Sequence, residues 1–266
     1  MMKRHNSRLV SVALLAAAAL LSACSSGGGF RTETINFSRE SLLEDGREEK
    51  MTFTAEVEVP VGDYSEEVLR ACRFDIIEAL GLGCETVVEN ADIPSALEYA
   101  YNKFDQDYHQ SASQVLEAFK DSEDSSFMAS LNWEMNLSAN FMIPARGYQS
   151  LYFERYTFLG GAHGQGQKGA LCYKLASGER VKLDNLFTEG SREILSERLS
   201  DALVRQAEQE GFLDALFTRQ APVSESFYIC EDGICFIYGQ YQLGPYYLGC
   251  LEIMLSWDEV SDILKQ

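Results

Sequence analysis

The stretch that decides the fold is FERYTFLGGAHGQGQKGALCYKLASGERVKLDNLF, residues 153–187. It begins inside YQSLYFERYTFL (148–159), where Leu151 and Phe153 follow the alternation of a strand with one buried face. A glycine-rich loop comes next. GALCYKLASGERVKLDNLF then predicts a hairpin that turns at Ser177-Gly178 and leads into a short helical turn. The middle of the chain therefore predicts antiparallel strands joined by short connections.

Three glycines in the loop have the spacing G-x-G-x-x-G of a dinucleotide-binding turn: Gly164, Gly166 and Gly169. A true dinucleotide turn follows a buried strand and opens a helix. Here the residues after Gly169 alternate like a strand instead. No Gly-Lys-Ser/Thr follows, so the spacing does not fit a phosphate-binding P-loop either. We therefore expect no nucleotide and no cofactor at this loop.

His163 is the one histidine of the loop and has five glycines around it. Glycine permits tight turns and close approach of the backbone to a partner. We expect Gly160, Gly161, His163 and Gly164 to form a turn in which His163 bonds to the backbone, with ligand binding by this loop as the first alternative. Catalysis by His163 is the weaker alternative, because a general base needs a partner within hydrogen-bond reach. Asp184 is an acid that folding could bring close to it.

The strands of the first half, residues 30–149, are indicated by alternation. KMTFTAEVEVP (50–60) places Phe53, Ala55, Val57 and Val59 on one face. LNWEMNLSANFMI (131–143) alternates in the same way. Both segments therefore predict strands with one buried face.

Two helices are expected between these strands. Ser65 precedes two acidic residues and an apolar series up to Leu80, which predicts a helix with a favourable N-terminal charge. A second helix is expected to start near Pro94, where Ser95-Ala96-Leu97-Glu98 fits a capping box, and to run to Lys120.

The second half, residues 150–266, predicts one longer helix and a further hairpin. Ser191 is placed to cap a helix through about Glu210, and GCLEIMLSWDEVSDIL (249–264) predicts a closing strand and a short helix. Strand pairs separated by grouped helices indicate the α+β class, with antiparallel sheets and packed helices in two small halves.

Six cysteines follow Cys24, an even number that allows three disulfides in an exported chain. Asp232-Gly233 predicts a two-residue hairpin turn that sets Cys230 opposite Cys235. Opposed Cβ atoms lie about 4.5–5.5 Å apart, so a disulfide would need local adjustment. Two packed free thiols are the equal alternative.

A structural metal site is not expected from the sequence. The chain has no C-x-x-C, and only His109 and His163 lie beyond its first 23 residues. Structural zinc sites are built from close sets of cysteine and histidine.

The N-terminus has the pattern of an export signal. Lys3, Arg4 and Arg8 precede an apolar run from Leu9 to Leu21, and the segment ends in Leu21-Ser22-Ala23-Cys24. An apolar core of this length is too short to span a bilayer. Its end resembles a bacterial lipobox, which implies cleavage after residue 23 and lipid on Cys24. Residues 24–29 have the composition of a flexible tether. We expect an exported protein that is lipid-anchored to the cell membrane or the outer membrane and faces the periplasm or the exterior.

The chain is acidic, with a formal net charge of −19. Loss of residues 1–23 removes three basic residues and no acidic one, so the charge becomes −22. Such a charge opposes binding to nucleic acid and to anionic membrane surfaces. It permits a basic protein partner, although acidity also serves solubility alone.

Aromatic residues gather near the C-terminus, at Tyr238, Tyr241, Tyr246, Tyr247 and Trp257. Exposed aromatic rings stack on sugars and anchor protein partners. The cluster straddles a predicted strand pair, so most of its members are expected in the core. Tyr241, Tyr246 and Tyr247 are the candidate ligand contacts.

Residues 150–266 resemble the C-terminal domain of the RsiV-like proteins. The resemblance rests on Gly160-Gly161-Ala162-His163-Gly164, on Leu183-Asp184 with Leu186-Phe187, and on Gly244-Pro245-Tyr246 near the end. Phe158 and Leu159 depart from the family's usual Tyr-Thr. The first half is compatible with the smaller domain that usually precedes this module.

This resemblance implies a module found in lysozyme-sensing anti-sigma factors, in peptidoglycan deacetylases and in standalone lipoproteins. We expect a non-catalytic binding module of the cell envelope that recognises a basic protein such as lysozyme, or a wall glycan. A structural lipoprotein without a small ligand and an envelope hydrolase using His163 are the alternatives.

Overall fold

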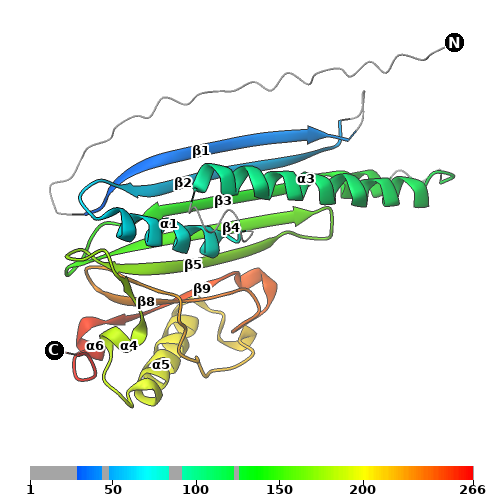
Figure 1. Ribbon diagram of the computed structural model, residues 1–266. Coiled ribbons are helices and arrows are strands. Elements are labelled where there is room, and N and C mark those ends of the chain that lie inside the picture. Colours follow the sequence, from blue (N-terminus) through cyan, green and yellow to red (C-terminus); the bar gives the residue numbers. More distant parts are fainter. Residues whose placement is uncertain (1–28, 44–47, 84–91, 123–125, 266) are drawn as a thin grey trace, which may run out of the picture.

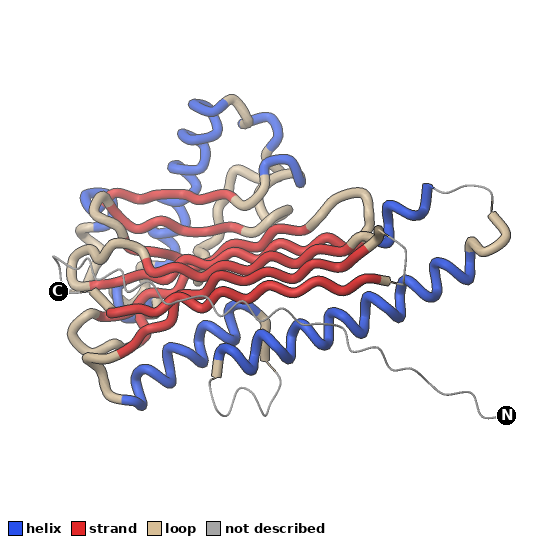
Figure 2. Tube along the Cα trace, turned by 90° about the horizontal axis from the view of Figure 1, so that it is seen from above, coloured by secondary structure: helices blue, strands red, loops and turns tan. Residues whose placement is uncertain are grey.

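The computed structural model describes residues 29–43, 48–83, 92–122 and 126–265. Its larger part is a six-stranded sheet in the order β1-β2-β3-β4-β5-β6, which two helices cover on one face (Figures 1 and 2). The strands are β1 (Arg31–Leu42), β2 (Lys50–Val61), β3 (Trp133–Phe141), β4 (Tyr148–Leu159), β5 (Gln165–Lys174) and β6 (Arg180–Val181). The predicted α+β class is confirmed.

One strand pair departs from the expected antiparallel pattern. β2 and β3 run parallel, while every other neighbouring pair in this sheet is antiparallel. Parallel neighbours need a long crossover connection. The two helices provide it: α1 (Glu66–Leu80) and α3 (Ile93–Ala118) both lie between β2 and β3 along the chain.

Both helices begin close to their expected positions. Ser65 caps α1 by accepting a hydrogen bond from the amide of Val68. α3 is capped by Asp92, three residues before the expected cap at Ser95, whose amide donates to the Asp92 carboxylate. Pro94 then occupies the first turn, where its missing N–H costs nothing. The helix ends at Ala118, two residues before the expected limit.

The remaining residues form a smaller unit on the other side of the large sheet (Figures 1 and 2). Its three-stranded antiparallel sheet, in the order β7-β8-β9, packs against the long helix α5. Its elements are α4 (Leu183–Leu186), α5 (Arg192–Glu210), β7 (Phe227–Ile229), β8 (Gly233–Tyr238), β9 (Leu251–Ser256) and α6 (Trp257–Val260), with 3-10 turns η2 (Leu213–Ala215) and η3 (Tyr246–Leu248). A further turn, η1 (Ser126–Leu131), precedes β3.

Two apolar cores lie on opposite faces of β4 and β5. Leu171 and Tyr173 of β5 belong to the core under α1 and α3, whereas Cys172 between them belongs to the core around α5. Successive side chains of a strand point to opposite faces, so one strand can wall both cores. The expected division at residues 149/150 falls within β4, which pairs with both β3 and β5.

The hairpin of the second unit has a different register from the expected one. Tyr228 lies opposite Cys235 and Ile229 opposite Ile234, so the turn is Glu231-Asp232 and Gly233 already belongs to β8. A Cβ on Gly233 would lie 2.1 Å from the Leu255 carbonyl oxygen, so glycine is needed here for strand packing and not for the turn. Cys230 and Cys235 are not opposed, and both thiols are free. The predicted disulfide is thus contradicted.

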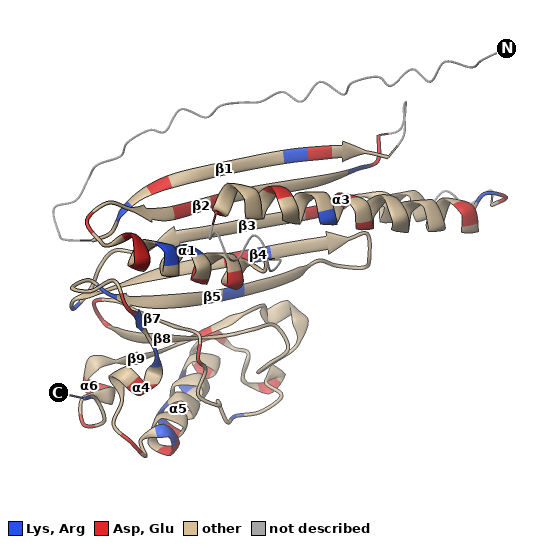
Figure 3. Ribbon diagram, viewed as in Figure 1, with Lys and Arg blue, Asp and Glu red and all other residues tan. Residues whose placement is uncertain are grey.

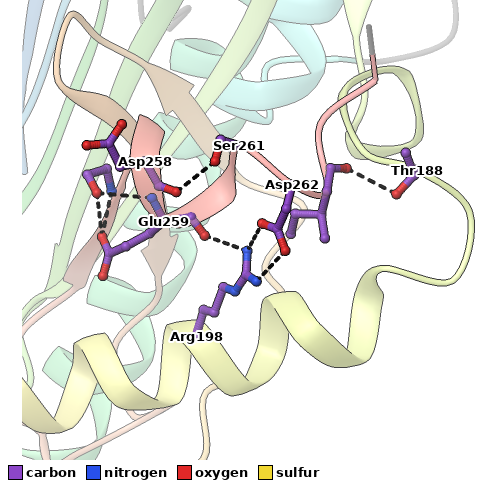
Figure 4. Close-up of polar contacts among 8 residues, drawn as sticks. Thr188, Arg198, Asp258, Glu259, Ser261 and Asp262 are labelled. Carbon is purple, nitrogen blue, oxygen red and sulfur yellow. Dashed lines mark hydrogen bonds and ion pairs between the residues drawn. The ribbon is translucent and has the colours of Figure 1, made fainter.

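An ionic network holds the C-terminus against α5. Figure 4 shows the Arg198 guanidinium reaching the Glu259 carbonyl oxygen and both carboxylate oxygens of Asp262, at 2.5 to 2.8 Å. Thr188 bonds the Ile263 carbonyl oxygen through its hydroxyl and its amide. These contacts fix residues 257–264 onto the second core.

Candidate binding site

The glycine loop joins β4 to β5 at one end of the large sheet (Figure 1). Gly160 has φ = 72°, and a Cβ at this position would lie 1.8 Å from the Ser130 carbonyl oxygen. Any side chain here would clash with backbone as well as strain the chain. Gly164 is buried beneath the ring of Tyr156, where a Cβ would lie 2.4 Å from ring atoms. The glycines therefore let the loop pack closely on its own strand and on η1.

His163 contacts backbone, as expected, and also an aromatic ring. Its Nδ1 lies 3.1 Å from the Gly164 carbonyl oxygen, and its ring stacks on Tyr246 with centroids 4.0 Å apart. The Tyr246 hydroxyl donates to the same Gly164 oxygen at 2.7 Å. The glycine loop is therefore in direct contact with Tyr246, one of the candidate ligand contacts near the C-terminus.

A second set of bonds joins the glycine loop to residues 239–250. The amide of Gly166 donates to the Gln240 side chain at 3.0 Å, and the Cys250 thiol points to the Gly166 carbonyl oxygen at 3.8 Å. The Gln242 side chain closes the 239–242 turn by accepting from the Gly239 amide. Two segments about 80 residues apart in sequence therefore form one rigid surface.

Tyr241 and Tyr247 are the exposed tyrosines of this surface. Their exposed fractions are 53% and 73%, and the Tyr241 ring lies 6.1 Å from that of Tyr246. Tyr241 has a positive φ of 63°, which is uncommon for a residue with a side chain and holds the ring outward at a turn. We call His163, Tyr241, Tyr246 and Tyr247 the tyrosine patch.

The expectation that most of the aromatic cluster lies in the core is wrong. Tyr238 alone is fully buried, where its hydroxyl donates to the Pro222 carbonyl oxygen. Trp257 is half-buried under the Arg146 guanidinium, and the other three members lie on the tyrosine patch. β8 ends at Tyr238, so Tyr241, Tyr246 and Tyr247 fall in the connection between β8 and β9.

His163 and Asp184 are not brought together. His163 precedes β5, whereas Asp184 follows β6, which pairs with Tyr173 and Cys172 near the other end of β5. Asp184 lies in the short helix α4 at the other end, where its carbonyl oxygen accepts from Lys265. The acid–base pair considered for a hydrolase is therefore contradicted by the topology.

A polar cluster between the two units was not apparent from the sequence. Glu252 of β9 accepts hydrogen bonds from the hydroxyls of Tyr152 and Tyr228, at 2.6 and 3.0 Å. Lys168 pairs with Glu154 at 3.0 Å and lies 4.0 Å from Glu252. Burial, and then the contact with Glu252, raise the pKa of Tyr152 well above its ordinary value. Only cross-strand placement reveals this cluster, because its members lie on β4, β5, β7 and β9.

Two negative observations apply to the described residues only. No three histidine, cysteine, aspartate or glutamate side chains of these residues are grouped so that they could hold a metal ion. No helix among them has the length and apolar character needed to cross a membrane. The predicted lipid site at Cys24 lies outside the described residues, as do the signal peptide and most of the tether.

Two family models match different parts of the chain. Residues 47–165 match the family model "Deacetylase PdaC", and residues 184–258 match "Protein of unknown function (DUF3298)". The expected resemblance is therefore met at the level of these two models, while the more specific likeness to RsiV stays a prediction.

One curated relative is the peptidoglycan-N-acetylmuramic acid deacetylase PdaC of Bacillus subtilis (strain 168). It is 28% identical over 140 residues, which cover 50% of this chain and 30% of the relative. The matched part therefore spans less than a third of the length of that protein.

Solved structures show the same fold over nearly the whole chain. A member of the DUF3298 family from Bacteroides fragilis NCTC 9343 matches with a TM-score of 0.74 at 18% identity, covering 90% of this chain and 95% of that one. A DUF3298 family protein from Pseudomonas aeruginosa PAO1 matches with a TM-score of 0.60 at 15% identity, covering 90% and 97%.

Proposed function

We propose that this protein is a lipid-anchored, non-catalytic module of the bacterial cell envelope, and that its tyrosine patch binds a basic protein such as lysozyme. The observation that carries the proposal is the exposure of Tyr241 and Tyr247 beside a stacked His163–Tyr246 pair. Tyrosine rings that are held rigid and exposed provide large contact area at a small entropic cost.

The construction of the patch supports a binding role. Hydrogen bonds to Gly164 and Gly166 fix both contributing segments before any partner arrives. A preorganised surface loses less conformational freedom on binding than a mobile one. The net charge of −19 favours encounter with a basic partner, and Figure 3 shows acidic residues spread over both units.

The envelope location is supported from two sides. The N-terminal pattern is that of an export signal ending at Cys24. The curated relative is named as a deacetylase of N-acetylmuramic acid in peptidoglycan. A glycan of the wall is the second occupant that the exposed rings could take, since aromatic faces also stack on sugars.

The test is calorimetric titration of residues 25–266 with lysozyme at low and high salt. The Debye length falls from about 8 Å at 0.15 M to about 3 Å at 1 M, so diffuse attraction between an acidic and a basic protein fades. Saturable one-to-one binding that survives high salt, and that is at least about tenfold weaker in Tyr241→Ala/Tyr247→Ala, is expected.

Ile143→Ala provides the matched control, because Ile143 is 88% exposed in the β3–β4 connection, outside the tyrosine patch. Binding that disappears at high salt, or that is equal in the double variant and the control, would rule out the patch as a lysozyme site.

The anchoring and the absence of catalysis have separate tests. Metabolic labelling with palmitate should mark the full chain and not its Cys24→Ser variant. Incubation of residues 25–266 with purified peptidoglycan should release neither acetate nor new reducing ends. Either product, formed by a preparation that loses activity in His163→Ala, would revive the hydrolase alternative.

A further inference from the structure

A groove of about 350 Å³ opens on the helical face of the large sheet, opposite the second unit. It lies where α1 ends at Leu80 while β4 continues to Leu159, so among the described residues α1 does not cover the last part of the strand. α3 forms one wall and the end of α1 the other, with the ends of β3 and β4 as the floor. The tyrosine patch involves the other face of β4, since Tyr156, which covers Gly164, alternates with the floor residues Arg155 and Thr157.

The lining follows from the periodicity of each element. Tyr99, Lys103 and Asp107 are four residues apart on α3 and share one helix face. Arg155 and Thr157 alternate on β4 and share one sheet face. Trp133 stands at the start of β3, opposite Leu159. Polar and aromatic groups are therefore directed into the groove from three elements.

Arg155 lies beside the end of α1. Its guanidinium lies so close to Gly81 that a Cβ there would be 2.6 Å from Nη1. Gly81 has φ = 66° and ends α1, so the left-handed helix cap favours glycine at this position. A cation beside the last carbonyls of a helix is favoured by the helix dipole.

The charged side chains that line the groove have no ion partner among the residues that the structure describes. Neither Lys103 nor Arg155 nor Asp107 makes an ion pair or a side-chain hydrogen bond with another described residue. The described lining thus carries one net positive charge in a chain whose net charge is −19. Two free cations facing one groove in so acidic a protein indicate a site for an anionic group.

The apolar part of the groove is lined by aromatic side chains. Trp133 is half-buried and packs on Phe104 with centroids 5.6 Å apart, while Tyr99 is 39% exposed. Aromatic faces favour contact with the C–H face of a sugar ring. The volume lies at the lower end of the range for small-molecule sites, about 300–1,000 Å³.

The geometry points to a binding site for a carboxylate-bearing saccharide, an acidic amino sugar of the N-acetylmuramic acid type. The sugar face would lie on Trp133 and Tyr99, and the carboxylate would take the guanidinium of Arg155 and the ammonium of Lys103. Arginine is suited to this role because its planar fork binds carboxylates in two places. Asp107 would accept from a sugar hydroxyl or amide. The choice of a wall sugar rests on the proposed envelope location, while the site itself is independent of the tyrosine patch.

The test compares two disaccharides of similar size on residues 25–266. N-acetylglucosaminyl-N-acetylmuramic acid carries a carboxylate, and N,N′-diacetylchitobiose does not. Calorimetric titration should give saturable one-to-one binding of the acidic disaccharide, at least tenfold tighter than that of the neutral one. Because the protein is acidic overall, diffuse electrostatics oppose this preference and cannot produce it.

Variants then assign the binding to the groove. Lys103→Gln/Arg155→Gln should abolish the preference for the acidic disaccharide and leave the weak binding of the neutral one unchanged. Lys174→Gln is the matched control, because Lys174 is an exposed cation at the far end of β5. Circular dichroism melting should show that the double variant remains folded, and Lys103→Gln alone, on the exposed helix face, provides a milder variant.

Two results would overturn the inference: equal affinity for the two disaccharides, or an unchanged preference in the double variant. Tyr241→Ala/Tyr247→Ala should bind the acidic disaccharide as tightly as the wild type does. The saccharide site and the protein-binding patch are therefore tested independently. If the wild type binds lysozyme but neither disaccharide, the saccharide site in the groove is rejected and the proposed function of the tyrosine patch stands.

Discussion

Tyr246 holds the glycine loop by two contacts at once: its ring stacks on His163 at 4.0 Å and its hydroxyl donates to the Gly164 carbonyl oxygen at 2.7 Å. The ring comes from η3 and the loop from the β4–β5 turn, so this residue joins the two segments of the tyrosine patch. The patch is therefore part of the folded framework and not a mobile appendage.

Tyr246→Phe should lower the free energy of unfolding by about 0.5–1.5 kcal/mol, the net value of one hydrogen bond, because it keeps the stacking and removes the hydroxyl. Tyr246→Ala should cost more, since the stacking is lost as well. Urea denaturation measures both. Tyr247→Phe is the control, and it should be neutral because its side chain is 73% exposed. Equal effects of the two Phe substitutions would contradict the role given to the Tyr246 hydroxyl.

Gly160→Ala should destabilise the protein by at least about 2 kcal/mol, because it combines a positive φ with a clash against the Ser130 carbonyl. Gly161→Ala is the neighbouring control: no atom lies within 4 Å of its added Cβ and its φ is not positive. It should change stability by no more than about 0.5 kcal/mol. Thermal unfolding of both variants is the measurement, and similar melting temperatures would argue against the observed loop geometry.

The Arg198–Asp262 pair predicts a pH dependence of stability. The hydrogen bond from Arg198 is the main cause that lowers the pKa of the Asp262 carboxyl in the folded state. A lowered pKa means that the stabilisation is present above the unfolded value of about 4 and is lost as the pH falls through the folded value. Wild-type stability should therefore decrease more steeply between about pH 5 and pH 2 than that of Asp262→Asn.

Urea titrations at several pH values measure this dependence. Glu33→Gln, on the exposed edge strand β1, removes an acid without an ion partner among the described residues and should keep the wild-type slope. Parallel curves for wild type and Asp262→Asn would show that the pair is not linked to folding.

Three thiols should resist alkylation in the folded protein. Burial raises the pKa of Cys72 to about 12, of Cys172 to about 11 and of Cys235 to about 12. At about pH 8 the reactive thiolate is then about a thousandth of each or less. Cys230 and Cys250 are only half-buried and should react with iodoacetamide first. Peptide mass mapping without reductant measures the order, with labelling in concentrated urea as the control.

This labelling also tests the hairpin register. A disulfide between Cys230 and Cys235 would leave both unlabelled in urea until reductant is added. That result would restore the opposed register and contradict the free thiols of the structure.

Local signals in the sequence predicted the elements with strong periodicity. Ser65 and the apolar series behind it gave the correct start of α1, and the turn at Gly178 is present with φ = 71°. β1 was not anticipated, because only Ile35 and Phe37 pack on the core from this edge strand. Edge strands need few apolar residues, so alternation alone does not reveal them.

The errors arose where a local rule competed with a contact distant in sequence. Asp232-Gly233 is a strong turn signal, yet Gly233 lies within β8 and packs closely on Leu255, and the turn lies one residue earlier, at Glu231-Asp232. The candidate site was half predictable: the glycine loop and the tyrosines were each identified, but their contact joins Gly164 to Tyr246 across 82 residues. The groove could not be identified, because it depends on where one helix stops over a sheet.

The sharing of β4 and β5 by both cores has a consequence for how the protein can be divided. A break within this hairpin would expose apolar side chains on both faces at once, so neither half is a self-sufficient folding unit. We therefore expect the two cores to unfold in one cooperative transition. Limited proteolysis should not yield two stable halves. If only one half were fused to another protein, one face of the β4–β5 hairpin would lose the core that packs on it. We therefore expect both halves to be needed in the same chain.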